Sequence, residues 1–257
     1  LGMSLRGMWV GTFHGLAHRL LKAHWRDAKL PENFQILDSD DQLRLVKRVM
    51  RAMDLDEQRW PPKQAQWWIN AQKDEGLRAA HIQETGDPHL LTMLRIYREY
   101  EDVCNRLGVI DFAELLLRAL ELWKDNPSVL DHYQQRFQHI LVDEFQDTDP
   151  VQFQIFSRLF GKEEKHWLYL IGDPKQSIYR FRGADLEAYF DFAKKTQAQR
   201  YSLMTNFRTV TPLVESVNAF FEESVQPFLH DELSFLSVNP NKDGAADKEK
   251  SFMDGIN

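Results

Sequence analysis

Apolar residues recur at helical spacing through much of the first half of the chain. The segment from Ser39 to about Met53 shows this most clearly. Its expected apolar stripe consists of Leu43, Val46, Met50 and Met53. Ser39 followed three residues later by Gln42 has the form of a capping box, in which each residue satisfies a backbone amide at the start of a helix. The pattern therefore predicts an amphipathic helix that begins at Ser39.

Prolines, glycines and acidic residues mark the ends of further helices. Asp87 precedes Pro88, and Asp111 stands three residues before Glu114, as is typical of helix starts. The helices expected from these signals run from Pro62 to Gly76, from Pro88 to Gly108 and from Phe112 to Lys124. Residues 28–107 are therefore expected to form an all-helical block.

Three tryptophans at helical spacing, Trp60, Trp67 and Trp68, belong to this block. They are expected to pack in its core, although exposed base-stacking surfaces are the alternative.

Two short apolar runs are too short for helices and are expected to be strands buried on both faces, as in a parallel sheet covered by helices. The first covers residues 140–142 and ends at Asp143 and Glu144, and the second covers residues 167–171 and ends at Gly172-Asp173. Asp143 and Asp173 lie 30 residues apart, about the length of one βαβ unit. Further strands are expected at Trp9-Val10 and from about Tyr201 to Thr205.

The paired acids after the first run carry the main chemical hypothesis. In open parallel sheets, ligands bind beyond the carboxyl ends of the strands. One carboxylate there can hold Mg²⁺, and its neighbour can orient or deprotonate an attacking water. The alternative is a strand end with two solvated acids. The second strand, which ends in Asp173, favours the functional interpretation.

Residues 172–184 form a second chemically dense segment, in which Tyr179, Arg180, Phe181 and Arg182 alternate aromatic and basic side chains. Aromatic rings stack on exposed bases and arginines hold phosphates, so this pattern fits single-stranded nucleic acid. An amphipathic edge with Tyr179 and Phe181 packed inward is the competing interpretation and, on this segment alone, the slightly favoured one.

Composition narrows the class of protein further. The formal net charge of -7 argues against general coating of nucleic acid, so any contact with DNA must come from a local groove. No apolar run reaches the length of a membrane span and no signal peptide is visible. The single cysteine, Cys104, fits a reducing cytoplasm. The polar residues 242–257 are expected to be disordered.

Four segments, taken in order, resemble motifs of superfamily I DNA helicases. Residues 142–148 and 172–184 resemble motifs II and III, residues 11–14 resemble motif Ib, and residues 205–208 resemble motif IV. The chain up to about Asp147 is similar to the UvrD-like branch, including residues 34–38 and 72–76 of the helical block. From Asp149 it is more similar to the RecB-like branch.

The resemblance implies roles for individual residues toward ATP and Mg²⁺. Asp143 would hold the Mg²⁺ of Mg-ATP, and Glu144 would activate the hydrolytic water. Gln176 would sense the γ-phosphate, Arg208 would stabilise charge on the transferring phosphoryl group, and Phe207 would stack on adenine. The residues expected along the DNA path are Thr12, His14, Tyr179, Phe181 and Arg182.

The sequence also departs from the family pattern. A helicase needs a phosphate-binding loop of the form G-x-x-x-x-G-K-[ST], and no segment of the chain has it. That loop is expected upstream of Leu1, and motifs V and VI are expected beyond Asn257.

The resemblance thus implies an α/β fold, the parallel sheet of a RecA-like P-loop NTPase with an all-helical insertion. The expected domains are residues 1–27 with 108–199 for an incomplete first RecA-like domain, 28–107 for the insertion, and 200–241 for the start of a second RecA-like domain.

The expected function is that of part of an ATP-dependent 3′–5′ DNA helicase in repair or recombination. It would act on single-stranded DNA and duplex junctions, with repair or recombination proteins as partners, no membrane association, and no hydrolysis by this chain alone. The main alternative is an ATP-independent single-stranded DNA-binding module or an inactive helicase remnant. A metal-dependent phosphoesterase that uses Asp143, Glu144 and Asp173 is less favoured.

Overall fold

The computed structural model describes residues 7–160, 166–177, 186–195, 199–224, 228 and 233–241. The chain divides into two compact units. The first comprises residues 1–172 with 177–185, and the second comprises residues 173–176 with 186–257. The expected disordered tail, 242–257, lies outside the described residues.

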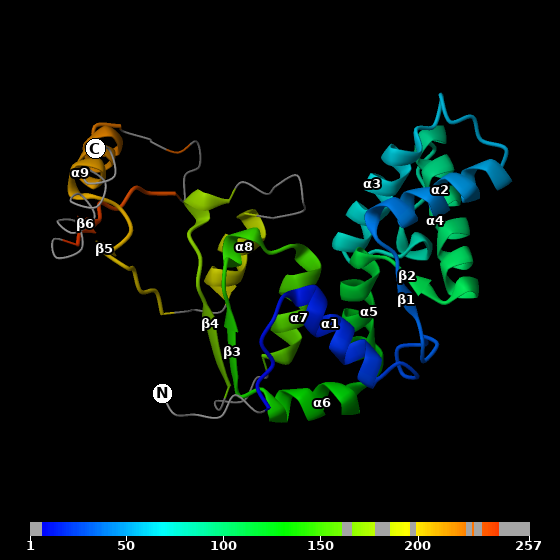
Figure 1. Cartoon of the computed structure of the whole chain (residues 1–257), viewed down its shortest axis with the longest axis horizontal. Coiled ribbons are helices and arrows are strands. Elements are labelled where there is room, and N and C mark those ends of the chain that lie inside the picture. Colours follow the sequence, from blue (N-terminus) through cyan, green and yellow to red (C-terminus); the bar gives the residue numbers. More distant parts are fainter. Residues whose placement is uncertain are drawn as a thin grey trace, which may run out of the picture. The chain divides into compact units, whose positions relative to one another are not determined.

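The first unit contains most of the helices and two of the parallel strand pairs (Figure 1). Its helices are α1 (Phe13–Ala23), α2 (Ser39–Ala52), α3 (Pro62–Asp74), α4 (Pro88–Leu107), α5 (Phe112–Asp125), α6 (Pro127–Arg136) and α7 (Pro150–Leu159). Its strands are β1 (Gln35–Ile36), β2 (Val109–Ile110), β3 (His139–Val142) and β4 (Trp167–Leu170). Two 3-10 turns, η1 (Ala79–His81) and η2 (Phe145–Asp147), complete it.

Several helix ends follow the expected signals. Asp87 accepts a hydrogen bond from the amide of His89 at the start of α4, and Gly108 ends that helix in the left-handed conformation, with φ 66°. Asp111 accepts from the amide of Glu114 at 2.8 Å and so begins α5. The predicted boundaries of these two helices are confirmed to within a residue.

The prediction that Ser39 caps the N-terminus of α2 is wrong. Asp38, not Ser39, caps the helix, with its Oδ1 accepting from the amide of Asp41 at 2.8 Å. A carboxylate suits this position because the exposed amides of a helix start carry partial positive charge. Gln42 is buried and bonds instead to the side chains of Gln66, Asn70 and Asp111.

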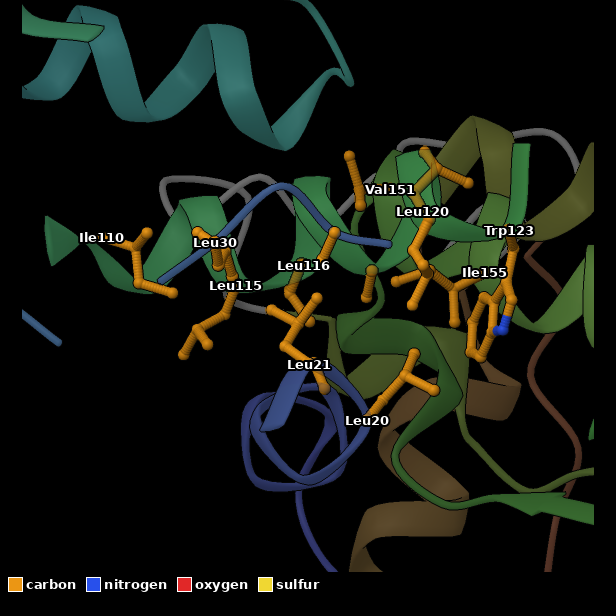
Figure 2. Packing of buried hydrophobic residues seen from close by; sticks show 14 of the residues in the cluster. Leu20, Leu21, Leu30, Ile110, Leu115, Leu116, Leu120, Trp123, Val151 and Ile155 are labelled. Carbon is orange, nitrogen blue, oxygen red and sulfur yellow. The ribbon is translucent and has the colours of Figure 1, made fainter. Parts of the chain in front are cut away.

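Two hydrophobic clusters form inside the first unit. The first joins α1, α5 and α7, and Figure 2 shows Leu20 and Leu21 of α1 facing Leu116 and Leu120 of α5. The second is formed by α2, α3 and α4 around residues such as Met50, Ile69 and Tyr97. Each cluster buries the apolar side of its helices, which is the main favourable contribution to folding.

The expected helical block is not helical throughout, because β1 lies within it and pairs in parallel with β2. Ala28, Leu30 and Phe34, at the start of the block, pack in the first cluster. The expectation that all three tryptophans pack in the core is wrong for Trp67, which is 70% exposed.

Strands β3 and β4 pair in parallel, with Val142 opposite Leu170. The expectation that both strands are buried on both faces is wrong. Residues alternate, with Ile140 and Val142 turned inward while Leu141 is 63% exposed. In the part of the chain that is described, the two strands pair only with each other, and one face of the pair remains open.

The strand expected at Trp9-Val10 does not form in the described structure. Trp9 instead packs edge-on against Tyr133 and Phe137, with ring centroids 5.4 and 5.3 Å apart, and Arg19 lies over its ring. Aromatic packing of this kind contributes beyond the apolar area it buries, and it fixes the side chain of Trp9 against α6 and the residue that follows it.

The second unit is smaller and holds η3 (Pro174–Gln176), α8 (Leu186–Lys195), β5 (Thr205–Asn206), α9 (Thr211–Glu222) and β6 (Asn239–Pro240). β5 pairs in parallel with β6. The strand expected from Tyr201 to Thr205 is therefore limited to its last residue and Asn206. Tyr201 and Leu203 are 86% and 90% exposed.

Among the described residues, no helix is both long enough and apolar enough to span a membrane.

A buried ionic cluster lies where α3, α4 and α5 meet. The Nζ of Lys73, on α3, lies 2.6 Å from Asp111 Oδ2 and 3.0 Å from Glu114 Oε2, and all three side chains are buried. Tyr100 of α4 donates its hydroxyl to the same Asp111 oxygen at 2.8 Å. Arg78 Nη1 lies 2.8 Å from the same Glu114 oxygen.

Charge pairing offsets the cost of burial in this cluster. Burial opposes the charged form, but Asp111 and Glu114 raise the pKa of Lys73 above its ordinary value. Burial would likewise raise the pKa of Glu114, yet Lys73, Arg78 and Arg118 together lower it below the ordinary range. Lys73 and Glu114 are therefore both charged at neutral pH.

Removing the central cation tests the energetic weight of the cluster. We expect Lys73→Met to lower the free energy of unfolding by about 3–5 kcal/mol, because it leaves Asp111 and Glu114 buried with a missing partner. The exposed Lys63 of α3 provides the matched control, and Lys63→Met should change stability by less than about 0.5 kcal/mol. Urea unfolding followed by circular dichroism measures the free energy of unfolding of both variants. Equal stability of the two variants would contradict a stabilising role of Lys73 in the ionic cluster.

Asp74, the next residue along α3, predicts a pH dependence of stability. Burial, with the nearby charges of Asp149, Asp111 and Glu75, raises its pKa from 3.8 to about 7. Folding therefore takes up a proton between these two values, and this group makes the protein less stable as the pH rises through that window.

Asp74→Asn should remove this part of the pH dependence. The variant should exceed the unmodified protein in stability by roughly 1–3 kcal/mol at pH 8 and match it near pH 3.5. Urea titrations at several pH values measure the difference, and Glu99→Gln, at an exposed acid of α4, is the control. A constant difference in stability between Asp74→Asn and the unmodified protein across the pH range would contradict the raised pKa of Asp74.

Candidate functional site

The candidate site begins where the paired strands β3 and β4 end. The amide of Ile171 donates to Val142 O at 2.8 Å, and the amide of Phe145 donates to Ile171 O at 2.9 Å. The chain after β3 therefore turns beside the end of β4. Asp143 and Glu144 occupy this turn, and both are exposed.

Glu144 is held in an uncommon backbone conformation. It has φ 52° and ψ 41°, in the left-handed region, which costs a residue with a side chain roughly 1–2 kcal/mol. Asp143 Oδ1 accepts from the Glu144 amide at 3.0 Å. Gln146 Nε2 donates to Glu144 Oε2 at 2.6 Å. The turn thus fixes both the backbone and the carboxylate of Glu144.

The donors fit a magnesium ion that arrives with phosphates. Mg²⁺ keeps several waters and takes one or two carboxylates together with substrate phosphate oxygens. Asp143 supplies an exposed carboxylate of this kind. Within the described ranges, no group of three or more His, Cys, Asp or Glu side chains is placed to hold a metal by itself.

Asp147 adds a further acid close to Glu144. Its Oδ1 is buried and makes no hydrogen bond within the described structure. Burial, followed by the charge of Glu144, raises the pKa of Asp147 above its ordinary value. The turn therefore concentrates negative charge at the end of β3.

Gln176 and Asp173 belong to the second unit, where they bond to each other. Gln176 Nε2 donates to Asp173 Oδ2 at 3.2 Å, and Lys175 Nζ lies 2.8 Å from Asp173 Oδ1. Although burial acts in the opposite direction, Lys175 and Gln176 lower the pKa of Asp173. Asp173 is therefore an ionised anchor for the turn η3 that carries Gln176.

Phe207 and Arg208 follow β5, also in the second unit. Asn206 Oδ1 accepts from the amides of Arg208 and Thr209, both at 2.9 Å, which fixes the turn that carries them. The ring of Phe207 is 70% exposed. An exposed ring on a fixed turn suits stacking on a planar base.

Thr12 and His14 lie at the start of α1 in the first unit. Thr12 caps the helix, with its Oγ1 accepting from the amide of Gly15 at 3.2 Å. The ring of His14 meets Phe112 edge-on at 5.8 Å, and burial lowers the pKa of His14. His14 is therefore neutral at pH 7 and suits contact with bases or sugars better than ion pairing with phosphate.

The structure brings Asp143 and Glu144 together in one turn and Thr12 and His14 together on one helix. The remaining DNA residues expected from the sequence, Tyr179, Phe181 and Arg182, lie outside the described residues.

Two residues of the site were not singled out from the sequence, although both stand within the quoted motifs. Gln146 is buried and bonds to Glu144. Gly172 leaves room for that glutamine, because a Cβ there would lie 2.5 Å from Gln146 Oε1. A glycine directly after a strand, on the ligand-binding edge, is the sequence signal that points to such a close approach.

Comparison with known proteins identifies related sequences. Residues 1–197 match the family described as the UvrD/REP helicase N-terminal domain. DNA helicase II of Escherichia coli K12 is 52% identical over 225 residues, which cover 87% of this chain and 31% of that protein. DNA helicase II of Haemophilus influenzae is 49% identical over 214 residues, which cover 83% of this chain and 29% of that protein. The ATP-dependent DNA helicase PcrA of Leuconostoc citreum is 32% identical over 216 residues, again covering 83% and 29%.

The chain therefore spans about a third of the length of these relatives. The similarity includes the turn after β3, and the expected kinship with UvrD-like superfamily I helicases is confirmed.

Because the backbone of Glu144 is left-handed, we expect a glycine variant at this position to be more stable than an alanine variant, the reverse of the usual order. Glu144→Gly should be more stable than Glu144→Ala by about 1 kcal/mol, because only glycine adopts this conformation without strain. Both variants lose the same carboxylate, so their difference reports the backbone alone.

Glu75 is the control, since its backbone is right-handed with φ -80° and ψ -4°. There the alanine variant should be at least as stable as the glycine variant. Thermal unfolding at one pH measures all four proteins. An alanine variant at position 144 that equals or exceeds the glycine variant would rule out the strain.

Proposed function

The chain belongs to the UvrD/REP helicase family, and on that premise we propose that it carries the magnesium-binding and water-activating carboxylates of an ATP-dependent 3′–5′ DNA helicase. One observation carries the proposal. Asp143 and Glu144 follow a strand that pairs in parallel with β4, and the turn fixes the carboxylate of Glu144. This is where open parallel sheets bind their ligands.

In this proposal Asp143 and Glu144 have different roles. Asp143 would hold Mg²⁺, which when bound with ATP neutralises phosphate charge. Glu144 would accept a proton from the attacking water. Because Gln146 engages Oε2, the other oxygen, Oε1, would take that proton. A carboxylate held in one orientation needs little reorganisation when the reaction occurs.

We also propose roles toward ATP for three residues of the second unit. Gln176, on a turn anchored by Asp173, would sense the γ-phosphate. Arg208 would stabilise charge on the transferring group, and Phe207 would stack on adenine. The exposure of Phe207 and the fixed turn after Asn206 support these roles.

Single-stranded DNA would contact Thr12 and His14 and be stacked by Tyr179 and Phe181, with Arg182 along its path. The edge-on pair of His14 and half-exposed Phe112 supports an aromatic contact surface near the start of α1. Translocation past these residues would allow unwinding at duplex junctions.

The domain assignment follows from the same premise. Residues 1–27 and 108–199 would form a first RecA-like domain, 28–107 its helical insertion, and 200–241 part of a second RecA-like domain. The separate hydrophobic cluster of α2, α3 and α4 supports a distinct insertion. A role in DNA repair or recombination in the cytoplasm, together with other proteins of that process, is consistent with the family and with the single free cysteine.

A second candidate function rests on one feature of the sequence, the lack of a G-x-x-x-x-G-K-[ST] loop. On this account the chain binds single-stranded DNA without hydrolysing ATP, as a binding module or an inactive remnant.

A hybrid protein separates the two candidates. Residues 8–197 would replace the matching segment of Escherichia coli DNA helicase II, which supplies the remainder of a helicase. We expect ATP hydrolysis that single-stranded DNA stimulates, and a fall in kcat by roughly 10²–10⁴-fold on Glu144→Gln, with nucleotide binding retained. A coupled ATPase assay and fluorescent-nucleotide titration measure these quantities.

Glu75→Gln in the same hybrid is the control and should leave kcat unchanged. Hydrolysis that survives Glu144→Gln would refute the role of Glu144. A folded hybrid that binds single-stranded DNA but hydrolyses no ATP would favour the binding module.

A further inference from the structure

Gln146 is a buried amide whose donor is directed at the candidate catalytic base. Its side chain is 2% exposed, and Nε2 donates to Glu144 Oε2 at 2.6 Å. The short distance is typical of a hydrogen bond to an ionised acceptor, which is stronger than a bond between neutral groups. Burial matters because a buried amide that loses its partner costs free energy.

The end of β4 is shaped around this glutamine. A Cβ on Gly172 would lie 2.5 Å from Gln146 Oε1, 3.1 Å from Phe145 N and 3.2 Å from Gln146 N. Real side chains do not tolerate the first of these distances, and two of the three atoms are backbone, which cannot easily move. Ser177 also donates its hydroxyl to Gln146 O at 3.2 Å. Position 172 must therefore be glycine for Gln146 to remain where it is.

The chemistry of the turn explains why this residue is an amide. Glu144 is exposed and strained, so without a fixed donor its carboxylate would sample several rotamers. A lysine or arginine here would hold it but would add a positive charge and make it a weaker base. An acid would repel it, as Asp147 already does. An amide orients a carboxylate without adding charge.

We propose that Gln146 is the positioning residue for Glu144, and that Gly172 provides the space in which it does so. The inference rests on the proposed function of Glu144 as the base. It extends that function to two residues beyond Asp143 and Glu144.

Side-chain hydrogen exchange in the 257-residue chain tests the bond without any need for hydrolysis. With ¹⁵N-labelled glutamine, the Nε2 hydrogens of Gln146 should exchange at least ~10-fold more slowly than those of the exposed Gln64. Glu144→Ala should remove most of that protection. Asp143→Ala removes the neighbouring charge and the acceptor of the Glu144 amide but leaves both partners of the Gln146–Glu144 bond, so it should preserve the protection.

Gly172→Ala tests the space. It should abolish the protection of Gln146, whereas Gly86→Ala, where a Cβ meets nothing within 4 Å, should not. The backbone amide spectrum shows whether each variant is folded, and if Gly172→Ala unfolds, the comparison of Glu144→Ala with Asp143→Ala decides the question.

Protection of Gln146 that survives Glu144→Ala would overturn the inference, since burial alone would then account for it, and would leave the proposed function standing. Conversely, hybrid hydrolysis unaffected by Glu144→Gln would overturn the proposed function while the hydrogen bond remained intact.

Discussion

The buried pairing of Lys73 with Asp111 and Glu114 is the constraint on which the first unit depends. Three charges removed from water are tolerated only when they are paired and hydrogen-bonded, and the partners come from different helices. Lys73 is on α3, the two acids are at the start of α5, and Tyr100 of α4 completes the set. Hydrophobic contacts are non-directional, whereas these ion pairs and hydrogen bonds require specific partners from all three helices.

The same end of α3 extends the constraint toward the candidate site. Gly76, just past the helix, packs closely on α7, since a Cβ there would lie 3.4 Å from Gln154 and 3.7 Å from Val151. Asp149 caps α7 by accepting from the amide of Gln152 at 2.7 Å. The turn with Asp143 and Glu144 thus lies between a strand paired with β4 and a helix, α7, that packs on the end of α3. A turn anchored at both ends can keep Glu144 in a strained conformation.

The sequence predicted elements better than it predicted burial. The positions of β3, β4, α4 and α5 follow from apolar runs, prolines and capping residues, because these signals are local. The open face of β3 did not follow, since a run such as residues 140–142 looks the same whether one or both faces are covered. Gln42 was assigned to a cap, although its partners lie as far away as Asp111. Contacts between distant segments leave no trace in local spacing.

Within the candidate site, the sequence identified the acids but not what orients them. Asp143 and Glu144 stand out in the sequence as charges after an apolar run. Nothing in the sequence distinguishes Gln146 from a solvent-exposed glutamine. Its role depends on the space left by Gly172, 26 residues later in the chain. Spatial complementarity of this kind becomes visible only once β3 and β4 are paired.

The most direct measurement is a crystal structure of the hybrid helicase with magnesium, ADP and an aluminium or beryllium fluoride that mimics the transferring phosphoryl group. We expect Asp143 within reach of the magnesium ion, directly or through water, and Glu144 hydrogen-bonded to the water aligned for attack. We also expect the bond from Gln146 to Glu144 unchanged. A nucleotide bound with both carboxylates turned to solvent, away from the metal and the water, would contradict this expectation.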